Sequence, residues 1–317
     1  MKKVVVIGGG TGVFTVLTGL KKYPFHLTAV VSIADDGGST GKLRDEFGVL
    51  PPGDIRRALV ALAGDDSAMM SEVFNFRFEK KSSLGGHSLG NLLLTALEKI
   101  TGSFDEAVKE AGNILRIHGD VIPVSLKSTK LCAQLENGEV VVGETNIDIP
   151  KHDAHLKINK IFLDPEVQAN KDAIRSIKEA DIVILGPGDL YTSILPNMVV
   201  KGIKEALSTT KAKVIYITNV MTKFGETQNF AASDFIVEME KYLGENIIDE
   251  VVINVEKPKG KALERYLKEK DEMVENDEKN IRKNIKVTTG KFLRAGQFVR
   301  HDPERLAKSL SKIINSN

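Results

Sequence analysis

A glycine-rich segment near the N-terminus has the composition of a phosphate-binding turn. It follows the apolar run Val4–Ile7, precedes an amphipathic stretch that extends to about Lys22, and consists of Gly8, Gly9, Gly10, Thr11 and Gly12. Glycines at the start of a helix let the backbone turn tightly and present its N–H groups to an anion. Val13 stands where the dinucleotide-binding fingerprint needs its last glycine, so the match to that fingerprint is partial. The alternative is a glycine turn that binds no ligand.

Two adjacent carboxylates, Asp35 and Asp36, follow the next apolar run and precede Gly37, Gly38 and Ser39. Carboxylates at the end of a strand suit a ribose hydroxyl or a divalent cation, and the glycines place backbone N–H groups beside them. Asp35 and Asp36 are therefore candidate ligands for Mg²⁺, although no cofactor is certain. The alternative is a solvated turn in which the carboxylates cap the backbone.

Polar residues at the starts of two further predicted helices extend the candidate site. Asp54 stands where we expect an N-cap, and Arg56 follows it with a guanidinium suited to phosphate. Successive helical residues point about 100° apart, so only one of Arg56 and Arg57 can face a given ligand. His87 and Asn91 flank the start of the predicted helix Leu89–Ile100, and His87 joins Asp35 and Asp36 as a candidate catalytic residue.

Three segments in the second half of the chain offer similar groups. The remaining candidate ligand-binding residues lie at or after the ends of two predicted strands or near the C-terminus, and they are Gly186, Pro187, Gly188, Asn219, Gly225, Glu226, Thr227 and Arg300. Loops that follow parallel strands gather at one edge of the sheet. We therefore expect these loops to form one cleft for an anionic, nucleotide-like ligand.

The predicted elements that position these residues alternate between strands and helices, as in α/β proteins. Short β-branched runs alternate with longer amphipathic stretches, which predicts a Rossmann-like, doubly wound, mostly parallel sheet. The predicted strands are 4–7, 27–33, 182–185, 214–220 and 251–255, and a helix is predicted from Pro196 to Leu207. Between about 117 and 165 the runs become short and hairpin-like, which predicts a β-rich insertion within a single domain of residues 1–317. A run rich in Lys and Glu at 256–286 is interpreted as a solvated helix face.

Composition excludes several classes of function. The chain has 317 residues and a formal net charge of +1, from 44 basic and 43 acidic side chains, so nucleic acid is not an expected partner. Its single cysteine, Cys132, forms no intramolecular disulfide and suits a reducing compartment. The chain has no apolar run of the ~20 residues that a membrane span needs, and we find no signal peptide before Val4. We expect a cytoplasmic protein, and the sequence leaves its oligomeric state open, a homo-oligomer included.

Taken together, the motifs resemble the CofD-like family, most closely its gluconeogenesis-factor (YvcK-type) branch. The matching segments occur in one order over nearly the whole chain, and they are Gly8–Gly12, Ala34–Ser39, Gly53–Arg56, Gly86–Asn91, Gly186–Ser193 and Met221–Thr227. The stretch Gly186–Ile194 is more similar to this branch than to the transferase branch of the family. Asp189 departs from the pattern, because serine is expected there.

This resemblance implies a Rossmann-like core and one of two functions. The gluconeogenesis-factor branch implies a cytoplasmic regulator that binds a UDP-sugar or a related nucleotide. Such a regulator is needed for growth on gluconeogenic carbon and for cell shape and cell-wall morphogenesis. The transferase branch implies instead a Mg²⁺-dependent enzyme of the 2-phospho-L-lactate transferase type. We expect regulatory binding, and a nicotinamide-dependent oxidoreductase is the least expected function because it rests on the partial fingerprint alone.

Overall fold

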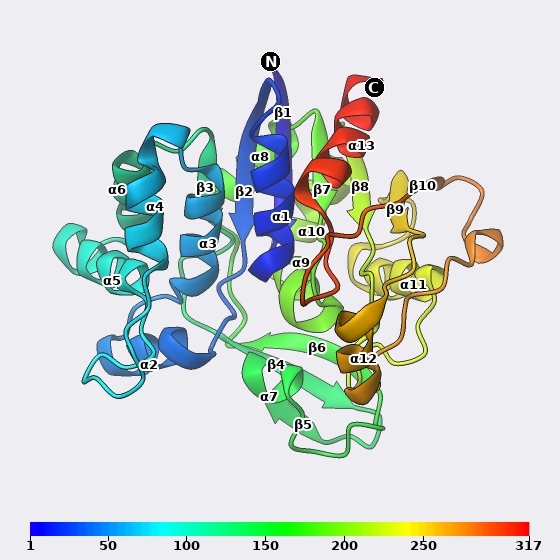
Figure 1. Cartoon of the computed structure of the whole chain (residues 1–317), viewed down its shortest axis with the longest axis horizontal. Coiled ribbons are helices and arrows are strands. Elements are labelled where there is room, and N and C mark those ends of the chain that lie inside the picture. The colour runs from blue at the N-terminus through cyan, green and yellow to red at the C-terminus, as the bar shows by residue number, and fades with distance from the viewer. Residues whose placement is uncertain (317) are drawn as a thin grey trace.

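A seven-stranded parallel sheet forms the centre of the protein, whose computed structural model describes residues 1–316 (Figure 1). Its strand order is β10-β9-β8-β7-β1-β2-β3, and a second, antiparallel sheet has the order β5-β4-β6. The α/β fold with an antiparallel insertion is thus confirmed. The strands are β1 (Lys2–Gly8), β2 (Phe25–Val31), β3 (Asp120–Pro123), β4 (Lys130–Leu135), β5 (Val140–Val142), β6 (Ile158–Asp164), β7 (Ile182–Leu185), β8 (Lys213–Ile217), β9 (Glu250–Asn254) and β10 (Lys286–Gly290).

Helices cover the large sheet. Helix α1 contacts both α3 and α13 in front of the sheet in Figure 1, and α8 and α11 both contact α10. The helices are α1 (Gly10–Leu20), α2 (Gly38–Phe47), α3 (Gly53–Leu62), α4 (Ala68–Asn75), α5 (Leu89–Thr101), α6 (Phe104–Leu115), α7 (Glu144–Asp148), α8 (Lys171–Glu179), α9 (Leu195–Met198), α10 (Ile203–Thr209), α11 (Ala232–Leu243), α12 (Gly260–Lys268) and α13 (Pro303–Asn315). Within residues 1–316, no helix combines the length and the apolar composition that crossing a membrane would require.

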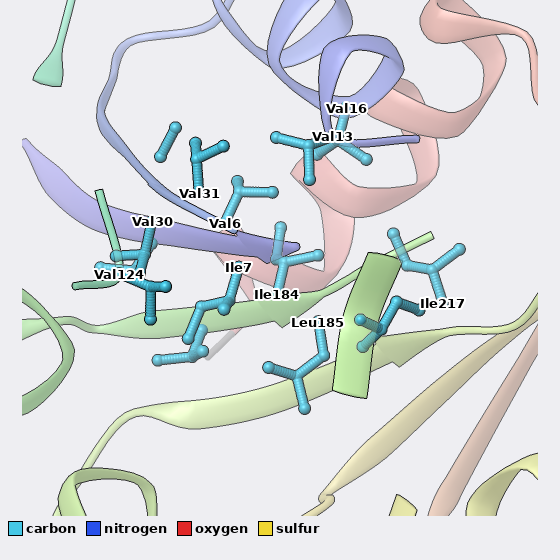
Figure 2. Close-up of a cluster of buried hydrophobic side chains, with 14 of the residues drawn as sticks. Val6, Ile7, Val13, Val16, Val30, Val31, Val124, Ile184, Leu185 and Ile217 are labelled. Carbon is cyan, nitrogen blue, oxygen red and sulfur yellow. The ribbon is translucent and has the colours of Figure 1, made fainter. Parts of the chain in front are cut away.

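Strands β1 and β7 are apolar because both of their faces are covered. Val4 to Ile7 and all four residues of β7 are buried. Successive residues point to opposite faces, so Val6 lies on the side of Val13 and Val16 of α1, whereas Ile7 points away from them (Figure 2). This continuous apolar run is the pattern of a central parallel strand.

The chain changes direction across the sheet at β1. From β1 it continues to β2 on one side, and β7 pairs with β1 on the other side. Open α/β sheets bind ligands at such a switch point, outside the carboxyl ends of the strands. The insertion sheet lies beyond these ends in Figure 1, so it can form one wall of a site there.

Three elements differ from the sequence prediction. β3, which we grouped with the insertion, pairs with β2 at the edge of the large sheet. The helix predicted from Pro196 to Leu207 is divided into α9 and α10, because Gly202 between them has a φ of +101°. Within 256–286, the main helix is the nine-residue α12, in which no residue is buried, and the segment ends at the unpredicted strand β10.

The contact between α1 and α13 depends on Gly19. A Cβ atom at this position would lie 2.2 Å from the carbonyl oxygen of Pro303 and 2.7 Å from the Cβ of Ala307. We predict that Gly19→Ala lowers the free energy of unfolding by about 1–3 kcal/mol, as measured by urea denaturation, because the two helices must separate. Lys312→Ala, on the exposed side of α13, is the control and should change stability by less than about 0.5 kcal/mol. Equal stabilities of the two variants would contradict this account of the contact.

Candidate functional site

A cavity of about 580 Å³ opens at the carboxyl ends of β1, β2, β7 and β8. The structure brings ten of the predicted residues to its wall, and they are Gly9, Gly10, Thr11, Gly12, Asp35, Asp54, Pro187, Gly188, Asn219 and Arg300. Residues that are 291 positions apart in the chain therefore face one space, since Gly9 and Arg300 both line it.

Two glycine turns form the floor of this cavity. A Cβ atom on Gly12 would lie only 1.8 Å from the carbonyl oxygen of Pro187, so the start of α1 and the turn after β7 come together only because residue 12 is glycine. Gly10 has a φ of +64°, and the N-cap residue Gly9 makes no side-chain capping hydrogen bond. Apart from the N–H of Gly10, which Asp54 accepts, the first-turn N–H groups of α1 face the cavity without a side-chain cap, as in anion sites at helix N-termini.

Two carboxylates, Asp35 and Asp54, lie beside the first turn of α1. The Oδ1 of Asp35 accepts the N–H of Gly37 at 2.9 Å. Asp54 accepts the N–H of Gly10 and pairs with Arg57 at 3.3 Å. Burial and the neighbouring Asp35 raise the pKa of Asp54 to about 6. The expectation that Asp54 is an N-cap was wrong: α3 begins at Gly53, and Asp54 lies within its first turn and faces the cavity.

Asp36 connects the large sheet to the insertion. Its Oδ2 accepts the N–H of Glu144 at 3.1 Å and its Oδ1 accepts the N–H of Thr145 at 2.8 Å, at the start of α7. Glu144 thereby comes to line the cavity together with Asp35. Burial, followed by the charges of Asp35 and Asp148, raises the pKa of Glu144 to about 9, so this side chain is neutral at pH 7.

Lys223 is held by carboxylates from three elements. Its ammonium group pairs with Asp148 of α7, with Asp189 at 3.5 Å and with Glu226 at 3.3 Å. Burial alone lowers the pKa of Lys223, but the three carboxylates outweigh it and raise the pKa well above the ordinary value. Lys223 is therefore a charged link between the insertion and the loop after β8.

A second polar cluster lies outside the cavity wall. The Oγ of Ser39 is 3.0 Å from the Nδ1 of His87 and accepts a hydrogen bond from Asn91 at 3.2 Å. Arg56 donates to Asn91 at 3.1 Å and to Asn75, so it connects α3 with α4 and α5. Arg57, one residue further along α3, lines the cavity instead.

The other predicted residues also lie outside the wall. Glu226 and Thr227 support Lys223, since the Oγ1 of Thr227 accepts the N–H of Lys223 at 3.0 Å. The residues of the predicted set that do not line the cavity are Gly8, Asp36, Gly37, Gly38, Ser39, Arg56, His87, Asn91, Gly186, Gly225, Glu226 and Thr227.

Comparison with known proteins places the chain in a family. The family model described as 2-phospho-L-lactate transferase CofD matches residues 4–293. The chain belongs to the CofD family. Within the CofD family it is similar to the gluconeogenesis factor of Bacillus subtilis, with 39% identity over 98% of each chain. A Thermotoga maritima protein, for which the name gluconeogenesis factor is provisional, is 46% identical over 98% of this chain and 99% of its own length. A crystal structure of a Bacillus halodurans protein superposes with a TM-score of 0.92 at 38% identity, covering 98% of this chain and 99% of the other.

The resemblance to the transferase branch of the CofD family implies a Mg²⁺ ion, for which Asp35 and Asp36 are the candidate ligands. Asp35 faces the cavity, whereas both oxygens of Asp36 are bound to backbone N–H groups of α7. Within residues 1–316, no three His, Cys, Asp or Glu side chains are placed to hold a metal ion together. The residues therefore do not form a protein-only metal site, and we derive no Mg²⁺-dependent step.

Several cavity residues of this CofD-family chain were missing from the predicted set. Glu144 and Asp148 come from the insertion, Tyr266 from α12, and Phe298 and His301 from the segment before α13. Burial lowers the pKa of His301 to about 4, so its ring is neutral at pH 7. Phe298 and His301 lie in the loop after β10, a strand that the sequence did not predict, and Glu144, Asp148 and Tyr266 come from helices, so they were not in the predicted set.

The raised pKa of Glu144 predicts a pH-dependent stability. The folded protein keeps a proton on Glu144 up to about pH 9, whereas the unfolded chain loses it near pH 4.5, so stability falls as pH rises between these values. Glu144→Gln removes this loss. The free energy of unfolding of the variant, relative to that of the unmodified protein, should therefore be higher at pH 8 than at pH 5.5 by roughly 1–3 kcal/mol, as measured by urea denaturation.

Glu110→Gln, an exposed position on α6, is the matched control and should change stability equally at the two pH values. An effect of Glu144→Gln that is independent of pH would show that the carboxyl is not neutral in the folded protein.

Proposed function

We propose that this CofD-family chain is a regulator that binds a UDP-sugar in the cavity. The observation that carries the proposal is the contact between the first turn of α1 and the turn at Pro187–Gly188, which places the N–H of Gly188 beside the first turn of the helix. Together these N–H groups suit a diphosphate, because the helix N-terminus is the positive end of the helix dipole.

The neighbouring side chains suit the rest of a nucleotide-sugar. Arg57 lies beside Gly10 and is suited to a phosphate oxygen, and Asp35 stands at the end of β2, where an acidic residue accepts a ribose hydroxyl. The Oδ1 of Asn219 is buried and has no hydrogen-bond partner within the described residues, so a donor on the ligand would satisfy it. Arg300 is a further phosphate partner in this proposal.

The proposed role in the cell follows from the relatives. The Bacillus subtilis and Listeria monocytogenes proteins are both named gluconeogenesis factor. We propose that binding of the UDP-sugar in the cytoplasm couples growth on gluconeogenic carbon to cell shape and cell-wall morphogenesis.

Isothermal titration calorimetry with UDP-N-acetylglucosamine tests this proposal. We expect saturable binding with one site per chain at ligand concentrations below 1 millimolar, on the order of intracellular metabolite concentrations. Folded protein that releases or absorbs no heat at millimolar ligand would overturn the proposal.

Substitution of Arg57 tests the placement of the diphosphate. Arg57→Met should weaken binding of UDP-N-acetylglucosamine roughly 10- to 100-fold, since a hydrogen bond to a charged group is worth about 1.5–3 kcal/mol. Arg57→Lys keeps the charge but loses the forked geometry and should have a smaller effect.

Arg116→Met is the control, because Arg116 is exposed, pairs with Asp66 and does not line the cavity. Its binding constant should equal that of the unmodified protein. If Arg57→Met also binds with unchanged affinity, the diphosphate lies elsewhere.

A further inference from the structure

Helix α12 and the segment Leu293–His301 pack against each other at the edge of the cavity and not within the main hydrophobic core. They contact a small separate apolar cluster in which Val220, Met221 and Val299 are buried, and Leu263 and Tyr266 pack against it from α12. Since no residue of α12 is buried, this cluster is its main apolar support.

The segment Leu293–His301 is a hairpin that is anchored at its base and open at its tip. Leu293 pairs with His301 in a bridge, and the N–H of Arg294 donates to the carbonyl oxygen of Arg300 at 2.9 Å. At Gly296, by contrast, a Cβ atom would have no neighbour within 4 Å. The hairpin therefore has a fixed base and an unsupported tip, and Figure 1 shows this segment before α13 passing beside the lower end of α1.

The hairpin presents an aromatic ring to the cavity. Phe298 lines the cavity, and 39% of its surface is exposed, so its ring is accessible from the cavity. The guanidinium of Arg265 lies 4.9 Å from the ring centroid, and that of Arg300 lies 4.7 Å from it. All three side chains line the cavity.

The two guanidinium groups differ in their other partners. Arg265 also pairs with Glu269 of its own helix at 3.2 Å, whereas Arg300 makes no ion pair within residues 1–316. The contact with the Phe298 ring is therefore the main interaction of the Arg300 side chain. A phosphate would compete with the ring for this guanidinium group, because an ion pair with a bidentate hydrogen bond is stronger than an exposed cation–π contact. Movement of Arg300 to a phosphate would leave one side of the Phe298 ring free for a planar group.

We propose that Phe298 is the platform on which the nucleobase of the bound nucleotide stacks, in the place that Arg300 occupies on the ring. This proposal rests on the proposed function, because it assigns the base of the same ligand. It accounts for an exposed aromatic ring at the mouth of a polar cavity, and it requires no change in the glycine turns that hold the phosphates.

The test compares two ligands that share phosphate chemistry but differ in the base. Phe298→Leu keeps an apolar side chain and removes the planar ring, so the affinity for UDP-N-acetylglucosamine relative to inorganic pyrophosphate should fall about tenfold or more. Phe298→Tyr keeps the ring and should retain the ratio of the unmodified protein. Titration calorimetry measures both ligands.

A fluorescence measurement reports the stacking itself. The chain contains no tryptophan, so Phe298→Trp introduces a single tryptophan whose emission should be quenched by UDP-N-acetylglucosamine but not by pyrophosphate. Phe47→Trp, at an exposed position of α2 outside the cavity wall, is the control and should respond to neither ligand.

The outcomes separate this inference from the proposed function. If the unmodified protein binds UDP-N-acetylglucosamine and Phe298→Leu binds it with an unchanged ratio to pyrophosphate, the stacking proposal is overturned and the proposed function stands. If the unmodified protein binds no UDP-N-acetylglucosamine, the proposed function fails and the assignment of its base fails with it.

Discussion

The cavity depends on the close approach of two backbone segments, the start of α1 and the turn after β7. Their contact exists because Gly12 has no side chain, which leaves room for the carbonyl of Pro187. Since β1 and β7 are neighbours in the sheet, both segments emerge at the point where the chain changes direction. A larger residue at position 12 would separate the two turns and with them the N–H groups that face the cavity. Every proposed ligand contact is arranged around this junction.

Charge distribution is the second constraint on the site. Asp35, Asp54 and Glu144 lie close together in one part of the wall, and burial, followed by their mutual repulsion, raises the pKa values of Asp54 and Glu144. Arg57 and Lys223 supply positive charge, but Lys223 is already paired with three carboxylates. Its pairing with Asp148 joins the insertion to the large sheet. The insertion therefore forms a wall of the cavity, and its position is coupled to the charges inside.

The sequence patterns predicted several of the cavity residues that lie in a loop directly after a strand of the large sheet. Gly9–Gly12, Asp35, Pro187–Gly188 and Asn219 meet this condition, because parallel strands deliver their loops to one edge. The turn at Gly85–Ser88 does not meet it: this turn precedes α5 but follows no strand of the sheet, so His87 lies in a separate cluster with Ser39.

Other features required three-dimensional information. The periodicity of a helix shows that Arg56 and Arg57 point in different directions, but only packing shows that Arg56 is buried against α5 and that Arg57 faces the cavity. Likewise, Phe298 reaches the cavity through a hairpin and Arg265 through the short helix α12, and only the packing of these elements against Val220 and Met221 brings them there. The carboxylates Asp35 and Asp36 are adjacent in sequence, yet one faces the cavity and the other binds the start of α7.

A crystal structure of the protein with UDP-N-acetylglucosamine tests the central claim most directly, because it locates the phosphorus atoms. Our account predicts that the diphosphate lies within hydrogen-bonding distance of backbone N–H groups in the first turn of α1 and of the N–H of Gly188 in the turn after β7. Density for the diphosphate in any other part of the molecule, with these two turns making no contact to the ligand, would contradict it.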